Sequence, residues 1–298
     1  MKKLTLITVC LTCFVGSLFS QKTASTKTST KNVATEKITA DLAEAISKKW
    51  VELTAEGLGG HRGEKVRLVC KNTRGSALRI RIPSGQLLLP GDENQQTLVV
   101  AEEKTVTVPL KKPVEMLLKT FCTEPGDGSP TGGMKFAIGS LATENVRKML
   151  DFMAKSGKTD SDEAQAAIWS VCEGSYNVAG IGQAELTGEA CRILNRPVPG
   201  YRIRYETRDI PGESAFSGKA LVVDGNYKYF LPKDEKLTIA LFDAEGKSIK
   251  VLSKDRLATA GEHRSSLHLE VKGLKQGRYF LRITTQSGEL IKEQEVEF

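Results

Sequence analysis

The sequence predicts a mainly β protein with helices (α+β), in which an N-terminal β-sandwich-like domain with a helical cap precedes an Ig-like β-sandwich. Three observations lead to this fold class. Apolar and polar residues alternate through most of the 298-residue chain, as they do in half-buried strands. Gly, Pro, Asn and Asp separate these runs at short intervals. Helical spacing of apolar residues is limited to the beginning and the middle of the chain.

The first 21 residues are predicted to be a secretory signal peptide. Lys2 and Lys3 precede an apolar run over 4–19, and small residues follow it. Residues 22–35 are rich in Thr, Ser and Lys and are predicted to be a disordered linker. We expect an exported protein, in the periplasm, at the cell surface or outside the cell. No other stretch is apolar enough to span a membrane, so no span is expected after signal removal.

Residues 36–200 are predicted to form an α+β passenger domain. Its first element is expected to be a helix over 35–56, because Ile38, Leu42, Ile46, Trp50 and Leu53 recur at spacings of four and three. This helix either docks on the β-rich core or presents Trp50 as part of a face for a partner. The period then changes to two, which predicts five strands in an antiparallel sandwich, at 66–70, 78–82, 97–101, 105–110 and 114–122.

The helical cap is predicted after this sheet. One helix is expected over 143–155, a second begins after a cap at Asp160 or Ser161, and a weaker third spans 183–194. Residues 201–215 are assigned as a linker. Seven short strands are expected in 216–298, which is the pattern of an Ig-like sandwich; they are placed at 220–223, 227–231, 237–242, 248–252, 266–271, 279–284 and 290–296.

The mature chain keeps an even set of cysteines, Cys70, Cys122, Cys172 and Cys191. Cysteines in an exported protein are expected to pair as disulfides. Of the three possible connectivities we favour Cys122–Cys172, which leaves Cys70–Cys191, although buried free thiols are the alternative.

Composition excludes several functional classes. The net charge of +7 falls to +5 without Lys2 and Lys3, and no arginine cluster with interleaved aromatics occurs, so nucleic acid is not an expected partner. The mature sequence lacks the Cys and His spacings of a zinc site, and carboxylates such as Glu124 and Asp127 are too sparse for a calcium loop. No metal, cofactor or catalytic constellation is expected, so the protein is predicted not to be an enzyme.

The last domain resembles a known family. The segments at 229–232, 237–247, 260–263 and 274–283 follow in order the motifs of the Ig-like C-terminal sorting domain of type IX secretion cargo, and of the related hook-capping module. The resemblance covers 216–298. It implies export through the outer membrane, contact with the secretion machinery, removal of the domain, and surface attachment or release. The chain departs from the family in its acidic end, 292–298, where a basic tail is common.

The middle block is similar to the glutamine motif of thioester domains in surface adhesins. The likeness lies in Ala164-Gln165-Ala166-Ala167-Ile168-Trp169, although Ala164 stands where the motif usually has Thr. The resemblance implies that the Cys122 thiol and the Gln165 side chain could form an internal thioester that acylates an amine. That chemistry requires a cysteine on a strand held against a glutamine on a helix.

The sequence therefore predicts a secreted or surface binding protein with a C-terminal sorting or attachment domain and an unidentified extracellular ligand. The two alternatives are a covalent adhesin with a Cys122–Gln165 thioester and a structural component of the envelope.

Overall fold

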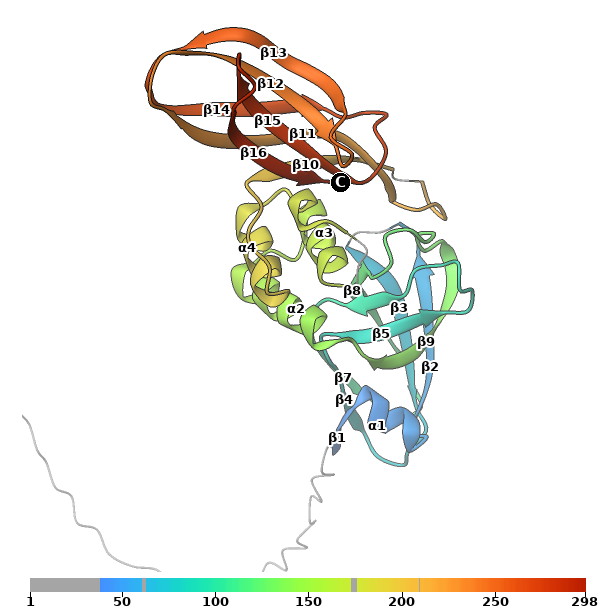
Figure 1. The fold of residues 1–298 in the computed structure, drawn as a ribbon. Coiled ribbons are helices and arrows are strands. Elements are labelled where there is room, and N and C mark those ends of the chain that lie inside the picture. Colours follow the sequence, from blue (N-terminus) through green and yellow to red (C-terminus); the bar gives the residue numbers. More distant parts are fainter. Residues whose placement is uncertain (1–37, 61–62, 173–175, 209) are drawn as a thin grey trace, which may run out of the picture. The chain divides into compact units, whose positions relative to one another are not determined.

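The computed structural model describes residues 38–60, 63–172, 176–208 and 210–298, which are mainly β with a few helices (Figure 1). The predicted signal peptide, 1–21, and the predicted linker, 22–35, lie outside these residues. The chain enters the described region at a short strand and leaves it at the end of the last sheet.

The N-terminal region contains a closed six-stranded barrel, in the order β2-β3-β8-β6-β5-β9. The prediction of a two-layer sandwich here was wrong. Three barrel strands, β2, β5 and β9, were not predicted, and β9 pairs with both β2 and β5 and thereby closes the sheet. The barrel strands are β2 (Val51–Leu58), β3 (Glu64–Asn72), β5 (Gln86–Pro90), β6 (Leu98–Val100), β8 (Val114–Cys122) and β9 (Gly132–Leu141).

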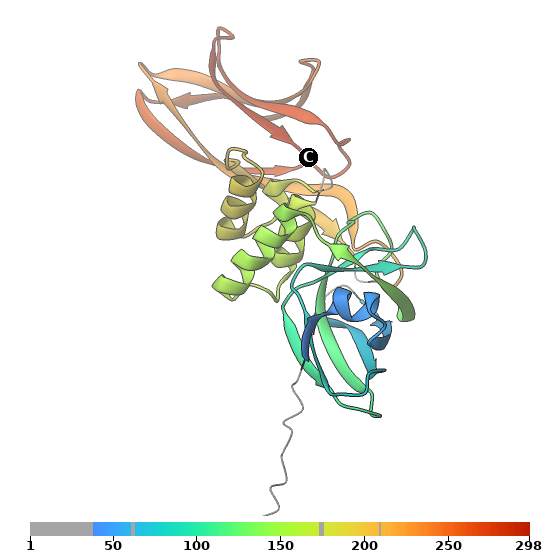
Figure 2. The ribbon, with the colours of Figure 1, turned by 90° about the horizontal axis from the view of Figure 1, so that it is seen from below.

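Alternating side chains of the barrel strands fill its interior. Val66, Leu68 and Cys70 of β3 point inward and are fully buried. A small sheet of β1 (Ile38–Asp41), β4 (Leu78–Ile82) and β7 (Lys104–Val108) adds to the same core. Helix α1 (Leu42–Ser47) lies over one end of the barrel (Figures 1 and 2) and buries Leu42 and Ala45 there.

The helix expected over 35–56 is present only as the six residues of α1. Lys49 adopts a left-handed conformation, with φ at 54°, and ends the helical path. The chain then enters β2, where Val51, Ala55 and Gly57 are buried and their neighbours are more exposed. The helical spacing of apolar residues was misleading because the same residues also fit a strand that the barrel needs between β3 and β9.

Three helices follow the barrel close to their predicted positions: α2 (Glu144–Ser156), α3 (Asp162–Val171) and α4 (Ala184–Ile193), with the short turn η1 (Val178–Gly180) before α4. Ser161 is the N-cap of α3, as one of the two predicted alternatives, and its Oγ accepts a hydrogen bond from the Ala164 N–H at 3.2 Å. The helices share one apolar core, which includes Met149, Leu150 and Ile168.

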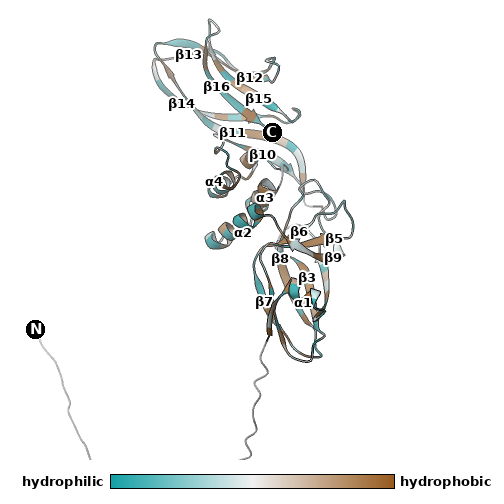
Figure 3. Cartoon of the chain, turned by 60° about the horizontal axis from the view of Figure 1, so that its bottom comes forward, coloured by the Kyte–Doolittle hydropathy of each residue, from teal (hydrophilic) through white to brown (hydrophobic). Residues whose placement is uncertain are grey.

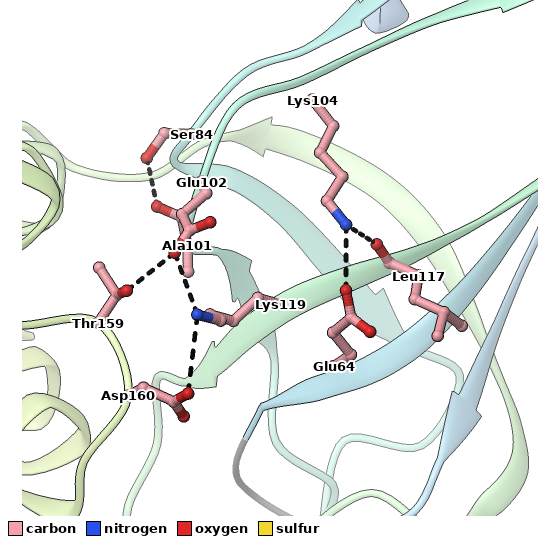
Figure 4. A network of polar contacts seen from close by, with 9 residues as sticks. All are labelled: Glu64, Ser84, Ala101, Glu102, Lys104, Leu117, Lys119, Thr159 and Asp160. Carbon is pink, nitrogen blue, oxygen red and sulfur yellow. Dashed lines mark hydrogen bonds and ion pairs between the residues drawn. The ribbon is translucent and has the colours of Figure 1, made fainter. Parts of the chain in front are cut away.

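Polar contacts tie the start of α3 to the barrel (Figure 4). Lys119 on β8 lies 3.2 Å from Glu102 and 4.0 Å from Asp160, and the Thr159 hydroxyl donates to Glu102 at 2.8 Å. The hydrogen bond from Thr159, together with the Lys119 ammonium, lowers the pKa of the Glu102 carboxyl. The network therefore fixes the loop before α3 against β8.

The C-terminal region has two antiparallel sheets, β10-β11-β14 and β13-β12-β15-β16, which share one apolar core. The range 201–215, expected as a linker, contains β10, because Ile203 of that strand is buried in this core. The strands are β10 (Tyr201–Thr207), β11 (Phe216–Leu231), β12 (Glu235–Asp243), β13 (Ser248–Ala258), β14 (Gly261–Glu270), β15 (Arg278–Thr285) and β16 (Leu290–Glu297).

The first two strands predicted in this region are one continuous strand, β11. The turn expected at 224–226 does not form, because Gly225 pairs with both Tyr201 and Leu267. A Cβ on Gly225 would lie 2.9 Å from the Gly200 carbonyl oxygen, so this glycine permits the backbones of β11 and the residues around Gly200 to approach closely. In Figure 3, hydrophobic and hydrophilic residues are mixed along the strands of both regions, as expected for sheets with one buried face.

Candidate functional site

Cys122 is the last residue of β8 and is buried. It lies opposite Leu98 of β6, but the hydrogen bonds to β6 come from its neighbours, such as the Thr123 N–H to the Thr97 carbonyl oxygen at 3.0 Å. Backbone groups of successive strand residues point to opposite sides, so the N–H and C=O of Cys122 face away from β6. On that side β3 pairs with β8 only as far as Lys119. Among the described residues, which do not include 61 and 62, no strand lies beside Cys122 at this edge.

Gln165 fills this open edge from α3. The Cys122 N–H donates to Gln165 Oε1 at 2.9 Å, and Gln165 Nε2 donates to the Cys122 carbonyl oxygen at 2.8 Å. The carboxamide thus imitates the backbone of a paired strand. Both residues are buried, with exposed fractions of 1% for Cys122 and 2% for Gln165. This contact brings together the two residues that the adhesin resemblance selected.

The sequence of α3 explains how the glutamine reaches the barrel. The helix is buried on every side from Ala164 to Val171. Gln165 and Trp169 are four residues apart and share a face, and Trp169 packs into the barrel core while Ile168 packs into the helical core. The alanines at 164, 166 and 167 are small enough for α3 to fit between the two cores.

Burial and the nearby charge of Glu124 raise the pKa of the Cys122 thiol well above its usual range. The thiol is therefore protonated at neutral pH. Water is excluded from both groups because neither has appreciable exposed surface.

A cavity of about 1000 Å³ lies beside this pair. Its wall includes residues 123–127, which directly follow Cys122, together with Cys172 and the segment 216–219. Cys122 and Gln165 do not line it. Cys122 directly precedes Thr123, a lining residue that is itself only 9% exposed.

A strap formed by residues 210–216 holds the loop that follows Cys122. Ser214 Oγ donates to the Pro125 carbonyl oxygen at 2.6 Å, and the Ser129 N–H donates to the Glu213 carbonyl oxygen at 2.9 Å. Ala215 is buried in the barrel core, and the Phe216 ring packs against Trp169 with 6.2 Å between centroids. These contacts fix the loop between β8 and β9.

The favoured disulfides are not present. All four cysteines of the described residues are free thiols. Cys70 and Cys122 face the barrel core, whereas Cys172 ends α3 beside the helical core and Cys191 lies in α4. An even number of cysteines in an exported chain suggested pairs, but the fold assigns the members of each pair to different packing units. Burial raises the pKa of Cys70 and Cys172 to about 12.

Trp50, the residue suggested for a partner face, lies between α1 and β2 and is half-buried against the barrel core. The Lys48 Nζ and the Arg74 guanidinium lie over its ring, at 4.6 Å and 4.1 Å from the centroid. The role of Trp50 in binding stays a prediction. Within the part of the chain that the structure describes, no group of three or more His, Cys, Asp or Glu could hold a metal ion.

Sequence reasoning missed the residues that support the pair. Glu124 Oε2 accepts from the Thr97 N–H at 2.7 Å, and Thr123 Oγ1 donates to the Thr97 carbonyl oxygen at 2.9 Å. These contacts join positions 26 or 27 residues apart, which no local pattern reveals. The adjacency of Glu124 to Cys122 was the one available signal.

The comparison with protein families bears on the C-terminal sheets. Residues 223–297 match a family model described as "Secretion system C-terminal sorting domain". The C-terminal region is a type IX secretion sorting domain. The resemblance found in its sequence motifs is thereby confirmed, in spite of the acidic end.

The sorting domain gives the chain its destination. A protein that carries it is a cargo of type IX secretion and is exported to the cell surface or the extracellular space, and the domain implies contact with the secretion machinery. No helix among the described residues is long and apolar enough to cross a membrane.

Other comparisons add little. No curated protein matches the chain. Among solved structures, a red sea bream transglutaminase is similar at 11% identity and a TM-score of 0.20, over 85% of this chain and 33% of its own. A β-glucosidase from Kluyveromyces marxianus is similar at 9% identity and a TM-score of 0.20, over 78% of this chain and 44% of its own. A structure of the CBM51-2 and INT domains of Clostridium perfringens ZmpB, in complex with GlcNAc, is similar at 11% identity and a TM-score of 0.18, over 83% of this chain and 79% of its own. This chain therefore spans less than half of the first two proteins, and scores this low carry no argument about fold or function.

Proposed function

We propose that the passenger, 36–200, is a covalent adhesin that attaches to a target through an internal thioester between Cys122 and Gln165. The observation that carries the proposal is the double hydrogen bond between the Gln165 carboxamide and the main chain of Cys122. These bonds hold the carboxamide against the main chain of the residue whose thiol would attack it, which supports the proposal by proximity.

Thioester formation needs no cofactor. The Cys122 sulfur attacks the Gln165 Cδ, a carbon–sulfur bond forms, the carbon–nitrogen bond breaks, and nitrogen leaves as ammonia with the thiol proton. A target amine then attacks the same carbon. The carbon–sulfur bond breaks, an amide joins Gln165 to the target, and the thiol regains a proton. Each chain consumes its own Gln165, so the activity is a single attachment and not enzymatic turnover.

Burial suits a bond that water would otherwise hydrolyse. Both groups are buried and neither lines the cavity, so a resting thioester is shielded from water. The alternative role of Gln165 is purely structural, since its carboxamide also completes the open edge of β8. A non-covalent binding passenger would keep Gln165 for that reason alone.

The C-terminal region would serve this function by delivering the passenger. Its two antiparallel sheets around one core support the Ig-like sandwich expected from the sequence. Sorting places the passenger outside the cell, where a covalent bond to a host or matrix amine resists being pulled off.

The test is the intact mass of the exported protein with and without methylamine. We expect the wild-type chain to lack the mass of one ammonia and to gain one methylamine when it is added. Cys122→Ala and Gln165→Ala should abolish both effects, whereas Cys172→Ala, which removes a neighbouring buried thiol, should keep them. A wild-type chain of unmodified mass would make the passenger a non-covalent binding module with a structural Gln165.

A further inference from the structure

The carboxylate of Glu124 stands at the wall of the cavity beside the Cys122–Gln165 pair. It is held there from two sides. Its Oε2 accepts from the Thr97 N–H at 2.7 Å, and the following Pro125 is buried with its carbonyl oxygen bonded to Ser214. These two contacts hold the carboxylate at the cavity wall, two residues after Cys122.

One oxygen of this carboxylate has no other function in the fold. Among the described residues, Oε1 of Glu124 makes no hydrogen bond and no ion pair. The basic residues on the same cavity wall are engaged elsewhere, because Arg208 lies 3.6 Å and Lys219 3.9 Å from Glu206. The other ionisable groups of the wall are Asp127 and Cys172.

Aminolysis of a buried thioester has two proton problems. The attacking amine must lose a proton, and the leaving sulfur must gain one, because burial disfavours a thiolate at Cys122. Glu124 follows Cys122 by two residues and shares the cavity wall with Cys172, so its carboxylate lies on the side from which an amine would approach. A single group between the amine and the sulfur solves both problems.

We propose that Glu124 is the catalytic residue that transfers the proton from the attacking amine to the Cys122 sulfur. The proposal rests on the thioester of the proposed function. As the amine nitrogen bonds to the Gln165 carbon, its proton passes to the Glu124 carboxylate. As the carbon–sulfur bond breaks, the same carboxyl group gives a proton to sulfur. Glu124 ends ionised, as it began, and no other reactant is required.

The experiment follows methylamine incorporation over time in the full-length exported protein by intact mass. Glu124→Gln keeps an oxygen that accepts from the Thr97 N–H but cannot take a proton. We expect this variant to show the same ammonia loss as wild type and to incorporate methylamine about 10²–10⁴-fold more slowly. Asp127→Asn, which neutralises the other carboxylate of the wall, should stay within about twofold, because Asp127 does not follow the cysteine so closely.

A second variant separates catalysis from loop anchoring. Glu124→Ala removes the carboxylate, and added formate should accelerate its labelling in proportion to concentration while leaving wild type unchanged. Wild-type labelling rates in Glu124→Gln, or no response of Glu124→Ala to formate, would show that Glu124 only anchors the loop to Thr97. A wild-type chain without ammonia loss would instead overturn the proposed thioester, and this proposal with it.

Discussion

The passenger and the sorting domain are both mainly β, but they treat buried polar groups differently. Among the described residues, the sorting domain buries one uncharged polar side chain, Thr285. The passenger region buries eight, and several surround the loop that follows Cys122; the eight are Asn72, Gln86, Gln96, Thr120, Thr123, Ser129, Gln165 and Ser170. Buried polar groups reduce stability unless each is hydrogen-bonded, so their concentration at one loop indicates that this loop is shaped for more than packing.

The largest expected effect tests whether the two regions unfold separately. Trp169→Ala should lower the free energy of unfolding of the passenger by about 3–5 kcal/mol, because it empties the contact between α3 and the barrel core. Leu269→Ala is the matched change in the sorting domain and should cost about 2–5 kcal/mol there. Calorimetry should show each variant shifting one transition, and a common shift in both would contradict the separation.

The next effect measures the cost of the polar site itself. Gln165→Met leaves the buried N–H and C=O of Cys122 without partners and should destabilise the passenger by about 1–3 kcal/mol in urea titrations. Thr285→Val is the control in the sorting domain, where the hydroxyl accepts from the Glu289 N–H at 3.1 Å and shares a hydrogen bond with Ser287 Oγ at 2.8 Å, and about 1 kcal/mol is expected. Equal costs would remove the contrast between the regions.

Replacing one glycine in each region by alanine should change the stability of the two regions in opposite directions. Gly225→Ala should destabilise the sorting domain by about 1–3 kcal/mol, because the new Cβ meets the Gly200 carbonyl oxygen at 2.9 Å. Gly188→Ala should stabilise the passenger by about 0.5–1 kcal/mol, because this glycine lies in α4 with open space around it. Thermal melts of the two variants should therefore move in opposite directions.

The smallest effect is pH-dependent. The folded pKa of Glu102 is lowered, so its contribution is present above the unfolded pKa of about 4.3 and is lost as the pH falls through the folded value. Because the group is partly exposed, Glu102→Gln should cost under about 1 kcal/mol at neutral pH and nothing in strong acid. Thr159→Val, which removes the strongest partner, should reproduce part of this loss. A pH-independent difference from wild type would exclude the carboxylate as its source.

The local features of the fold were predictable from sequence. The helices α2, α3 and α4 and most strands were located because capping residues, turn residues and apolar periods are short-range signals. Barrel closure was not, since it depends on β9, whose pattern Gly132–Leu141 buries only Phe136 fully and has little alternation to detect. The helix expected over 35–56 failed for the related reason that strand neighbours far along the chain decided the outcome.

The candidate site was predictable in Cys122 and Gln165 but not in their surroundings. Gln165 and Cys122 were selected by a motif, and the structure brings them together. The Thr97 contacts of Glu124 and the strap at 210–216 arise from tertiary packing between segments far apart in sequence. The disulfides were expected from cysteine count alone, which carries no information on which core each thiol faces.

The strap has a consequence for maturation. Ala215 is buried in the barrel core, and Ser214 donates a hydrogen bond to Pro125 of the 123–127 loop. Both residues precede the segment that matches the sorting domain by only a few residues. A cut after Phe216 would leave the passenger with the Ser214–Pro125 hydrogen bond and with Ala215 in the barrel core near its new C-terminus. A cut before Gly212 would remove Ser214 together with the sorting domain, so the loop that follows Cys122 would lose this hydrogen bond. The position of such a cut would therefore decide whether the passenger keeps the contacts that hold the 123–127 loop.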